Sequence, residues 1–208
     1  MTSERLILDI DGTLWDSRAL VADGYNTQLA KEGLSHLSVT VEILTPLFGK
    51  TSEAIADILF ESLPQPERLP LVKRCMRSED EYLERFANQD MAYPKVIETV
   101  KALSRMYRLF IVSNCEAGYP QRCMEALGVS DCFRGTLCYG QTGTSKGQTI
   151  LSLMKEHNIQ NCAYIGDTQG DYEATLEANV PFIWAAYGLG SPVGFDAKIE
   201  SIDELLKM

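Results

Sequence analysis

The sequence has few of the residues that mark disulfide-bonded or zinc-binding proteins. Its 208 residues include six cysteines and two histidines. The cysteines form no C-x-x-C pair, and no histidine stands at zinc-ligand spacing from them, so neither a disulfide framework nor a zinc site is expected. We interpret all six as free, mostly buried thiols of a protein from a reducing compartment: Cys75, Cys115, Cys123, Cys132, Cys138 and Cys162.

Long apolar runs and excess positive charge are also missing. No apolar stretch approaches the roughly 20 residues that cross a bilayer, and residues 1–5 lead into a strand without the layout of a signal peptide. The formal net charge of −10 disfavours nucleic acid and anionic membranes as partners, because phosphate backbones are bound by clustered Lys and Arg. We expect a cytoplasmic protein, a monomer or weak homodimer, with no nucleic-acid or membrane partner.

Short apolar segments alternate with helical patterns along much of the chain. With 45% hydrophobic residues, the chain can bury a full core. Strands are predicted at residues 5–10, 108–113, 162–166 and 181–185, and helices at 95–106, 119–127, 146–156 and 172–178. This alternation predicts a Rossmann-like α/β fold, in which helices cover both faces of a doubly wound parallel sheet.

The first two predicted strands are separated by far more chain than a parallel crossover needs, which is about a dozen residues and its helix. The surplus is helical throughout, with Ser17 as an expected N-cap and Pro66 as an expected helix start. We predict a discontinuous α/β core of residues 1–15 and 89–208, and an inserted all-α cap domain of residues 16–88. An insertion directly after the first strand is placed where a lid belongs.

Polar residues follow three of the predicted strands. The first strand runs into Asp9-Ile10-Asp11-Gly12-Thr13, the second ends in Ser113-Asn114, and the third runs into Gly166-Asp167-Thr168-Gln169-Gly170-Asp171. In an open parallel sheet, ligands bind outside the carboxyl ends of the strands, near the point where the strand order reverses. The three groups are therefore expected to converge at one edge of the sheet.

The residues expected at this edge suit phosphoryl transfer. Acids gathered there are costly unless they hold a cation, and oxygen ligands favour Mg²⁺ over zinc. Ser113 and the backbone amides after it are candidate donors to an anion, and Lys146, after the flexible run 141–145, supplies a positive charge. Phosphoryl transfer depends on positioning and on charge neutralisation, which this set of residues provides.

The motifs follow the order found in the haloacid dehalogenase superfamily, and the chain resembles the phosphoglycolate-phosphatase-like members that carry a helical cap. The likeness covers essentially the whole chain. It implies that Asp9 is the nucleophile and a Mg²⁺ ligand, and that Asp11 is the general acid and base and gives its backbone carbonyl to the metal. It also implies that Asp167 binds Mg²⁺ and that Asp171 binds the metal or orients its ligands.

The same resemblance implies a set of substrate contacts. Ser113 and Lys146 are expected to hold the phosphoryl oxygens, and the implied phosphate site comprises Gly12, Thr13, Ser113, Asn114 and Lys146. Lys50 lies in the cap stretch that tends to descend toward the active site in this subgroup. It is therefore a further candidate for substrate binding.

The two carboxyl groups of the first motif need opposite electrostatic surroundings. Asp9 must be ionised to attack phosphorus, so we expect Mg²⁺ and Lys146 to lower its pKa. Asp11 must carry a proton when the leaving alcohol departs, so we expect its surroundings to raise its pKa.

The predicted function is that of a Mg²⁺-dependent phosphatase that hydrolyses a small soluble phosphomonoester, of the phosphoglycolate or sugar-phosphate type, through an aspartyl-phosphate on Asp9. Asp11 favours phosphate chemistry, because dehalogenating members of the superfamily lack an acid at that position. The enzyme alternatives are a phosphomutase and a phosphonoacetaldehyde hydrolase, in which Lys50 would form a Schiff base. The alternative from another class is a non-catalytic phosphate-sensing or scaffold protein.

Overall fold

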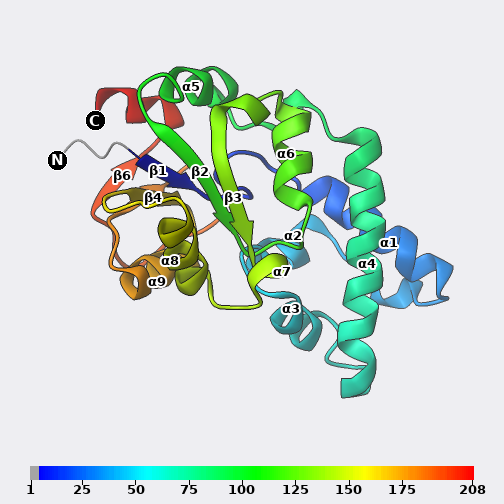
Figure 1. Ribbon diagram of the computed structural model, residues 1–208. Coiled ribbons are helices and arrows are strands. Elements are labelled where there is room, and N and C mark those ends of the chain that lie inside the picture. The colour runs from blue at the N-terminus through cyan, green and yellow to red at the C-terminus, as the bar shows by residue number, and fades with distance from the viewer. Residues whose placement is uncertain (1–4) are drawn as a thin grey trace. The chain divides into compact units, whose positions relative to one another are not determined.

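The computed structural model describes residues 5–208, which divide into two compact units. The sheet unit comprises residues 5–16 together with Asn88–Met208, and the helical unit comprises Ser17–Ala87. Figure 1 shows the strands and helices of both units. Each unit has its own buried apolar core.

The sheet unit is built on six parallel strands in the order β3-β2-β1-β4-β5-β6 (Figure 1). The strands are β1 Arg5–Leu8, β2 Arg108–Ser113, β3 Phe133–Cys138, β4 Ala163–Gly166, β5 Phe182–Ala185 and β6 Ala197–Ile199. The chain proceeds outward from β1 in one direction and then from β4 in the other, so the order reverses between β1 and β4. The predicted doubly wound parallel sheet is confirmed.

The central strands are buried on both faces, which explains their continuous apolar sequences. Ile7, Phe110 and Tyr164 point to one face, where they pack with α8 (Lys146–Glu156) and α9 (Gln169–Ala178). Side chains alternate between the faces of a sheet, so their buried neighbours Leu8 and Ile111 point to the other face. The remaining α-helices of this unit are α5 Val96–Leu103, α6 Tyr119–Leu127 and α7 Tyr139–Thr142.

In the sheet unit, the sequence-based prediction omits two strands and one short α-helix. The omitted strands, β3 and β6, are the outermost strands of the sheet. The middle residues of β3 are partly or largely exposed at the edge of the sheet. An edge strand therefore lacks the continuous apolar run by which a buried strand is recognised. The omitted helix α7 covers the first two residues of the run 141–145, so the prediction of a flexible segment is wrong there.

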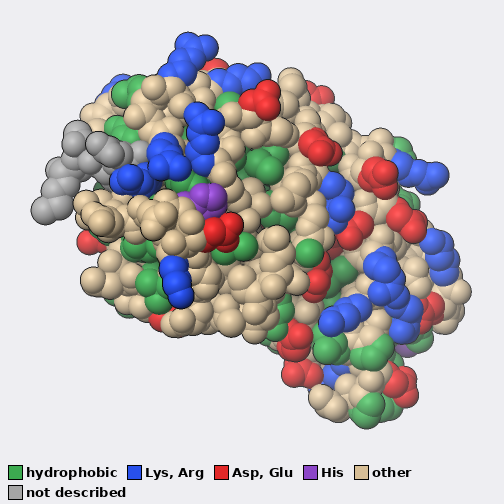
Figure 2. Space-filling view, in the orientation of Figure 1, with side chains coloured by type: hydrophobic (Ala, Val, Ile, Leu, Met, Phe, Trp, Pro, Cys, Tyr) green, Lys and Arg blue, Asp and Glu red, His purple; other side chains and the backbone are tan. Residues whose placement is uncertain are grey.

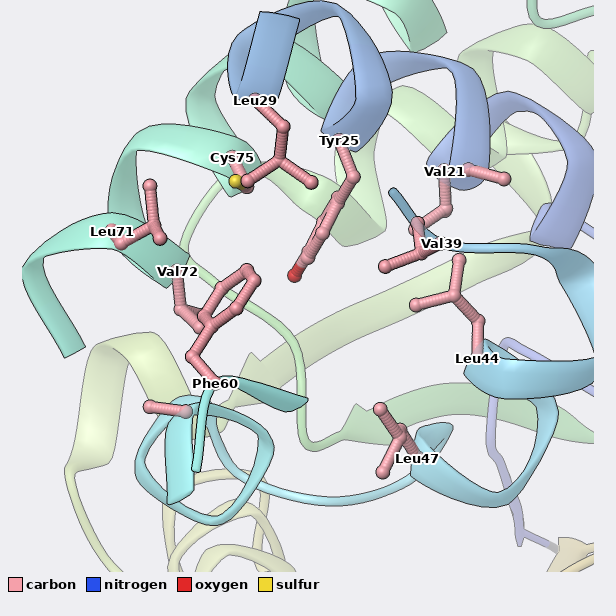
Figure 3. Packing of buried hydrophobic residues seen from close by; sticks show 12 residues of the cluster. Val21, Tyr25, Leu29, Val39, Leu44, Leu47, Phe60, Leu71, Val72 and Cys75 are labelled. Atoms are coloured by element: carbon pink, nitrogen blue, oxygen red, sulfur yellow. The ribbon is translucent and has the colours of Figure 1, made fainter. Parts of the chain in front are cut away.

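The helical unit contains α1 Arg18–Lys31, α2 Val41–Leu44, α3 Ser52–Leu59 and α4 Gln65–Phe86. Figure 3 shows Tyr25 and Leu29 of α1 directed toward Val72 and Cys75 of α4, with Phe60 closing the cluster below them. Burial of these apolar side chains supplies the main stabilisation of the unit.

Helices α1 and α4 approach each other closely. A side chain at Gly24 would lie 2.6 Å from the Cα atom of Glu79, so only glycine allows this approach. Near the C-terminal end of α1, Arg74 donates two hydrogen bonds to the carboxylate of Glu32, at 2.6 and 2.7 Å. Ser17 precedes α1 as predicted, but its side chain makes no capping hydrogen bond.

The surface of the long helix α4 is charged. On the face shown in Figure 2, basic and acidic side chains are interspersed over the region of α4, which has 22 residues. Among the helices of residues 5–208, none combines the length and the apolar character needed to cross a membrane.

Candidate active site

The site lies at the carboxyl ends of the central strands, where the strand order reverses. The register pairs Leu8 of β1 with Ile111 of β2 and with Ile165 of β4. Residues two positions farther along these neighbours, Ser113 and Asp167, therefore lie level with the turn that follows β1. Three segments that are distant in sequence meet at this edge, as in other doubly wound sheets.

The turn after β1 is held by its own backbone. Asp9 is buried, and the backbone N–H groups of residues 13–15 all donate to the carbonyl of Ile10. Gly12 has a φ of 81°, and a side chain at this position would overlap the carboxylate of Asp167. Conformation and space both require glycine here, and the turn is thereby brought against the end of β4.

Lys146 occupies a buried position among acids. Its Nζ atom lies 2.7 Å from Oδ1 of Asp171 and 3.2 Å from Oδ1 of Asp9. The same oxygen of Asp171 accepts a hydrogen bond from the hydroxyl of Tyr164 at 3.2 Å, and Oδ2 accepts from the N–H and the hydroxyl of Thr168 at 2.9 and 2.7 Å. Protein donors therefore occupy both carboxylate oxygens of Asp171.

Asp167 is only half satisfied by the protein. Its Oδ2 accepts a 2.7 Å hydrogen bond from the N–H of Leu189, in the loop after β5. Its Oδ1 is buried and has no hydrogen-bond partner. The loop packs tightly at this point, because a side chain at Gly188 would overlap both Asp167 and the carbonyl of Gly12. A buried carboxylate oxygen without a partner is costly, and a cation would satisfy it.

Burial controls the protonation of these acids. It raises the pKa of Asp9 to about 7, against the opposing ammonium of Lys146. Burial and the nearby carboxylates of Asp171 and Asp9 raise the pKa of Asp167 to about 8. Burial also acts on Asp171, but Lys146 and the hydrogen bonds from Thr168 outweigh it and lower the pKa. Lys146 acts on the Asp9 pKa in the expected direction, but without the metal it does not offset the loss of hydration.

The acids fit a hard cation. Asp9, Asp167 and Asp171 each offer one carboxylate oxygen, and these three oxygens lie within 4.8 Å of one another. Three ionised carboxylates around one ammonium would leave an excess of negative charge, and this repulsion adds to burial in raising the pKa values of Asp9 and Asp167. All-oxygen donors and the unpartnered Oδ1 of Asp167 suit a divalent cation.

Of the remaining predicted residues, Thr13, Ser113 and Asn114 lie in the sheet unit and Lys50 lies in the helical unit. Thr13 is fully buried at the turn after β1, and its hydroxyl has no hydrogen-bond partner. Ser113 is buried at the end of β2, and Asn114 follows it in a half-buried position. Lys50 belongs to the helical unit, where it lies in the turn before α3 with its side chain exposed. The predicted residues brought to one edge of the sheet unit are Asp9, Asp11, Gly12, Thr13, Ser113, Asn114, Lys146, Asp167 and Asp171.

Several contacts of these acids are not predictable from the motifs. Oδ1 of Asp11 accepts hydrogen bonds from the hydroxyl of Tyr119 at 2.7 Å and from the indole N–H of Trp15 at 2.9 Å. Tyr164 and the backbone amide of Leu189 are likewise found only in three dimensions. A tyrosine in an apolar strand and a backbone amide in a loop carry no sequence signal for such roles.

Comparison with known proteins adds to this geometry. A family model of haloacid dehalogenase-like hydrolases matches residues 6–185. The chain belongs to the haloacid dehalogenase-like hydrolase family. The match includes every acid of the site, and the family predicted from the sequence motifs is confirmed.

Curated relatives of this hydrolase include phosphoglycolate phosphatases. The chain is 28% identical to that of Agrobacterium fabrum over 201 residues, which cover 90% of this chain and 84% of the relative. It is 25% identical to that of Psychrobacter arcticus over 232 residues, which cover 100% of this chain and 97% of the relative. The predicted likeness to phosphoglycolate phosphatases is thus also confirmed.

Solved structures share the fold over the full chain. The crystal structure of a predicted phosphoglycolate phosphatase from Haemophilus somnus matches with a TM-score of 0.83 at 21% identity, covering 100% of this chain and 98% of the other. A haloacid dehalogenase-like family protein from Streptococcus pneumoniae matches with a TM-score of 0.81 at 19% identity, covering 100% and 99%. At these identities the likeness shows the fold.

Proposed function

We propose that this hydrolase is a Mg²⁺-dependent phosphatase that hydrolyses a small soluble phosphomonoester, of the phosphoglycolate or sugar-phosphate type, through an aspartyl-phosphate on Asp9. One observation carries the proposal: Asp9 is buried beside Lys146 and close to Asp167, a carboxylate with one oxygen that no protein group satisfies. Phosphoglycolate phosphatases among the relatives support the substrate class.

The metal would be held mainly by two carboxylates. Asp9 and Asp167 would each contribute an oxygen, together with the backbone carbonyl of Asp11. Asp171 would orient the site instead, because protein donors occupy both of its oxygens and it fixes Lys146 at 2.7 Å. When bound, Mg²⁺ would neutralise negative charge on the phosphoryl group and on the carboxylate that attacks it.

Asp9 would act as the nucleophile. Its carboxylate oxygen forms a bond to phosphorus while the bond from phosphorus to the ester oxygen breaks. Lys146 is held beside Asp9 by its ion pair with Asp171, so its ammonium is positioned to stabilise the transferred group. The hydroxyls of Thr13 and Ser113, with the polar groups around Gly12 and Asn114, would bind the phosphoryl oxygens.

Asp11 would move the protons. It donates a proton to the departing ester oxygen, which leaves as an alcohol. It then accepts a proton from the water that attacks the phosphorus of the aspartyl-phosphate, and this step releases inorganic phosphate and restores Asp9. The second carboxyl of the motif thus serves both half-reactions.

The helical unit is proposed to act as a cap that selects the substrate, with Lys50 as a candidate contact for an anionic group. The proposed boundaries of this domain are residues 16–88, between core segments 1–15 and 89–208. A Schiff-base lysine must be desolvated to lose its proton at neutral pH, and the exposed side chain of Lys50 gives no support to that role.

Hydrolysis of p-nitrophenyl phosphate tests the reaction class. We expect turnover with Mg²⁺ and none in EDTA. In a panel of metabolite phosphates, we expect one compound to be hydrolysed with the highest kcat/KM. Asp9→Asn should abolish turnover while the fold persists, whereas Asp131→Asn, a surface change in the same unit, should leave turnover unchanged. Full activity in EDTA would remove the metal from the mechanism. Failure to hydrolyse any phosphate ester would favour a phosphate-sensing or scaffold protein.

A further inference from the structure

Two buried aromatic side chains hold the carboxyl group of Asp11 by one oxygen. The hydroxyl of Tyr119 and the indole N–H of Trp15 both donate to Oδ1, at 2.7 and 2.9 Å. The two rings pack edge to face, with centroids 5.8 Å apart and an interplanar angle of 82°. Tyr119 is 4% exposed and Trp15 is fully buried, so water competes little for Asp11 at this oxygen.

The two donors come from different parts of the sheet unit. Trp15 belongs to the same turn as Asp11, and its carbonyl accepts a 3.0 Å hydrogen bond from the N–H of Gly12. Tyr119 is the first residue of α6 and follows Gly118, whose φ of 92° lets the chain turn into the helix. The carboxyl group is therefore fixed from two directions.

This arrangement determines which oxygen of Asp11 can transfer a proton. An oxygen that accepts two hydrogen bonds is the acceptor side of the carboxyl group, so a proton on Asp11 resides on Oδ2. Rotation of the carboxyl group would break both hydrogen bonds to Oδ1. Transfer of a proton from a positioned carboxyl group is effective only when its geometry is maintained.

We propose that Tyr119 is a positioning residue that orients Asp11 for proton donation to the leaving group. The inference rests on the phosphatase activity proposed above and adds a prediction about substrates. An alkyl phosphomonoester has a poor leaving group that needs the proton, whereas p-nitrophenolate departs without one. Hydrolysis of alkyl esters therefore depends on Tyr119, and hydrolysis of p-nitrophenyl phosphate does not.

The test compares kcat/KM of Tyr119→Phe for the preferred alkyl ester and for p-nitrophenyl phosphate, because kcat/KM reports the steps through phosphoryl transfer to Asp9. General acid catalysis contributes about 10² to 10⁴ in rate, and imperfect positioning should lose about tenfold of it. We expect that loss with the alkyl ester and less than about a twofold change with p-nitrophenyl phosphate. Tyr107→Phe, which removes a hydroxyl elsewhere in the same unit, should alter neither.

A double-mutant cycle separates positioning from a general structural effect. In an Asp11→Asn background, Tyr119→Phe should cause no further loss with the alkyl ester, because the group that it orients no longer transfers a proton. A further loss in that background, or equal losses with both substrates in the single variant, would overturn the role of Tyr119. So would unchanged kinetics.

The variants also separate this inference from the proposed function. If the wild-type protein hydrolyses neither substrate, the phosphatase proposal is refuted. If the wild type is active but Tyr119→Phe affects the alkyl ester and p-nitrophenyl phosphate equally, only the role of Tyr119 is refuted. Phenylalanine keeps the ring packed on Trp15, and the melting temperature reports whether the fold persists. If that variant does not fold, Tyr119→Leu removes the same hydroxyl and carries the same comparison.

Discussion

Lys146 and Asp171 form a buried ion pair, with 2.7 Å between Nζ and Oδ1 and with side chains that are 4% and 0% exposed. Such a pair gives little net stability when intact, but the loss of one partner leaves the other charge buried and uncompensated. The position of the lysine beside Asp9 therefore depends on Asp171.

Replacement of this lysine should affect activity and stability together. Lys146→Met should abolish turnover and lower the free energy of unfolding by about 3 kcal/mol at neutral pH, because buried carboxylates lose their counter-charge. Urea unfolding measures the change. Lys155→Met, at an exposed position of the same helix, should stay within about 0.5 kcal/mol of wild type. Equal stability of the Lys146 variant would show that the pair does not matter to the fold.

Stability in EDTA should fall as the pH rises from about 4 to about 8. Burial raises the pKa of Asp9 to about 7 and that of Asp167 to about 8, from an ordinary 3.8. In this window the folded state retains protons that the unfolded state has released, so each rise in pH favours unfolding. Asp171, whose pKa is lowered, and Lys146, whose pKa is raised, titrate outside this window.

Urea unfolding at several pH values in EDTA measures this slope. Asp167→Asn should flatten it and raise stability at pH 8, because the amide removes one buried charge. The surface variant Asp131→Asn should retain the wild-type slope. Addition of Mg²⁺ at pH 8 should recover the lost stability through ligand binding, and a flat wild-type profile in EDTA would contradict the expected protonation of the site.

The loop after β5 should tolerate no side chain at Gly188. Gly188→Ala would force a methyl group into the carbonyl of Gly12 and the side chain of Asp167, so we expect loss of activity and of several degrees in melting temperature. Gly170→Ala is the matched control, since a methyl group there would lie 3.6 Å from the hydroxyl of Thr168, an ordinary contact distance, and alanine favours the helix. Similar behaviour of the two variants would disprove the tight fit.

Lys50 should affect one class of substrate only. If it contacts a second anionic group, Lys50→Ala raises KM for an anionic metabolite and leaves hydrolysis of p-nitrophenyl phosphate nearly unchanged. Lys73→Ala, an exposed change elsewhere in the helical unit, should leave both unaffected. Unchanged kinetics with the anionic substrate would assign substrate choice to other residues of the cap.

The central part of the fold could be predicted because its residues carry local signals. Strands β1, β2, β4 and β5 each contain a continuous apolar run, since helices cover both faces of the sheet. The edge strands β3 and β6 lack such runs and are missed. The bounds of α6 and α8 agree with the predicted residues 119–127 and 146–156. Amphipathic helices show a periodic pattern of apolar residues in the sequence, whereas a partly exposed edge strand shows no such pattern.

The site could be predicted only to the level of its charged residues. Asp9, Asp167 and Lys146 stand next to strand ends or helix starts, so their convergence follows from topology. The hydrogen-bond donors that orient the acids cannot be predicted from the topology. Tyr119 is 108 positions from Asp11 in the sequence, and the donor of Leu189 is a backbone amide that no residue type marks. The raised pKa of Asp9 also requires three dimensions, since it results from burial.

The interior position of β1 constrains how the chain is assembled during synthesis. Leu8 has no strand partner until Ile111 has been made, and the second partner, Ile165, is made later still. Residues 17–87 can meanwhile form their own core. We therefore expect this segment to fold first on the ribosome. Its compaction shortens the loop that must close before β1 can pair, which lowers the entropic barrier to a sheet of high contact order.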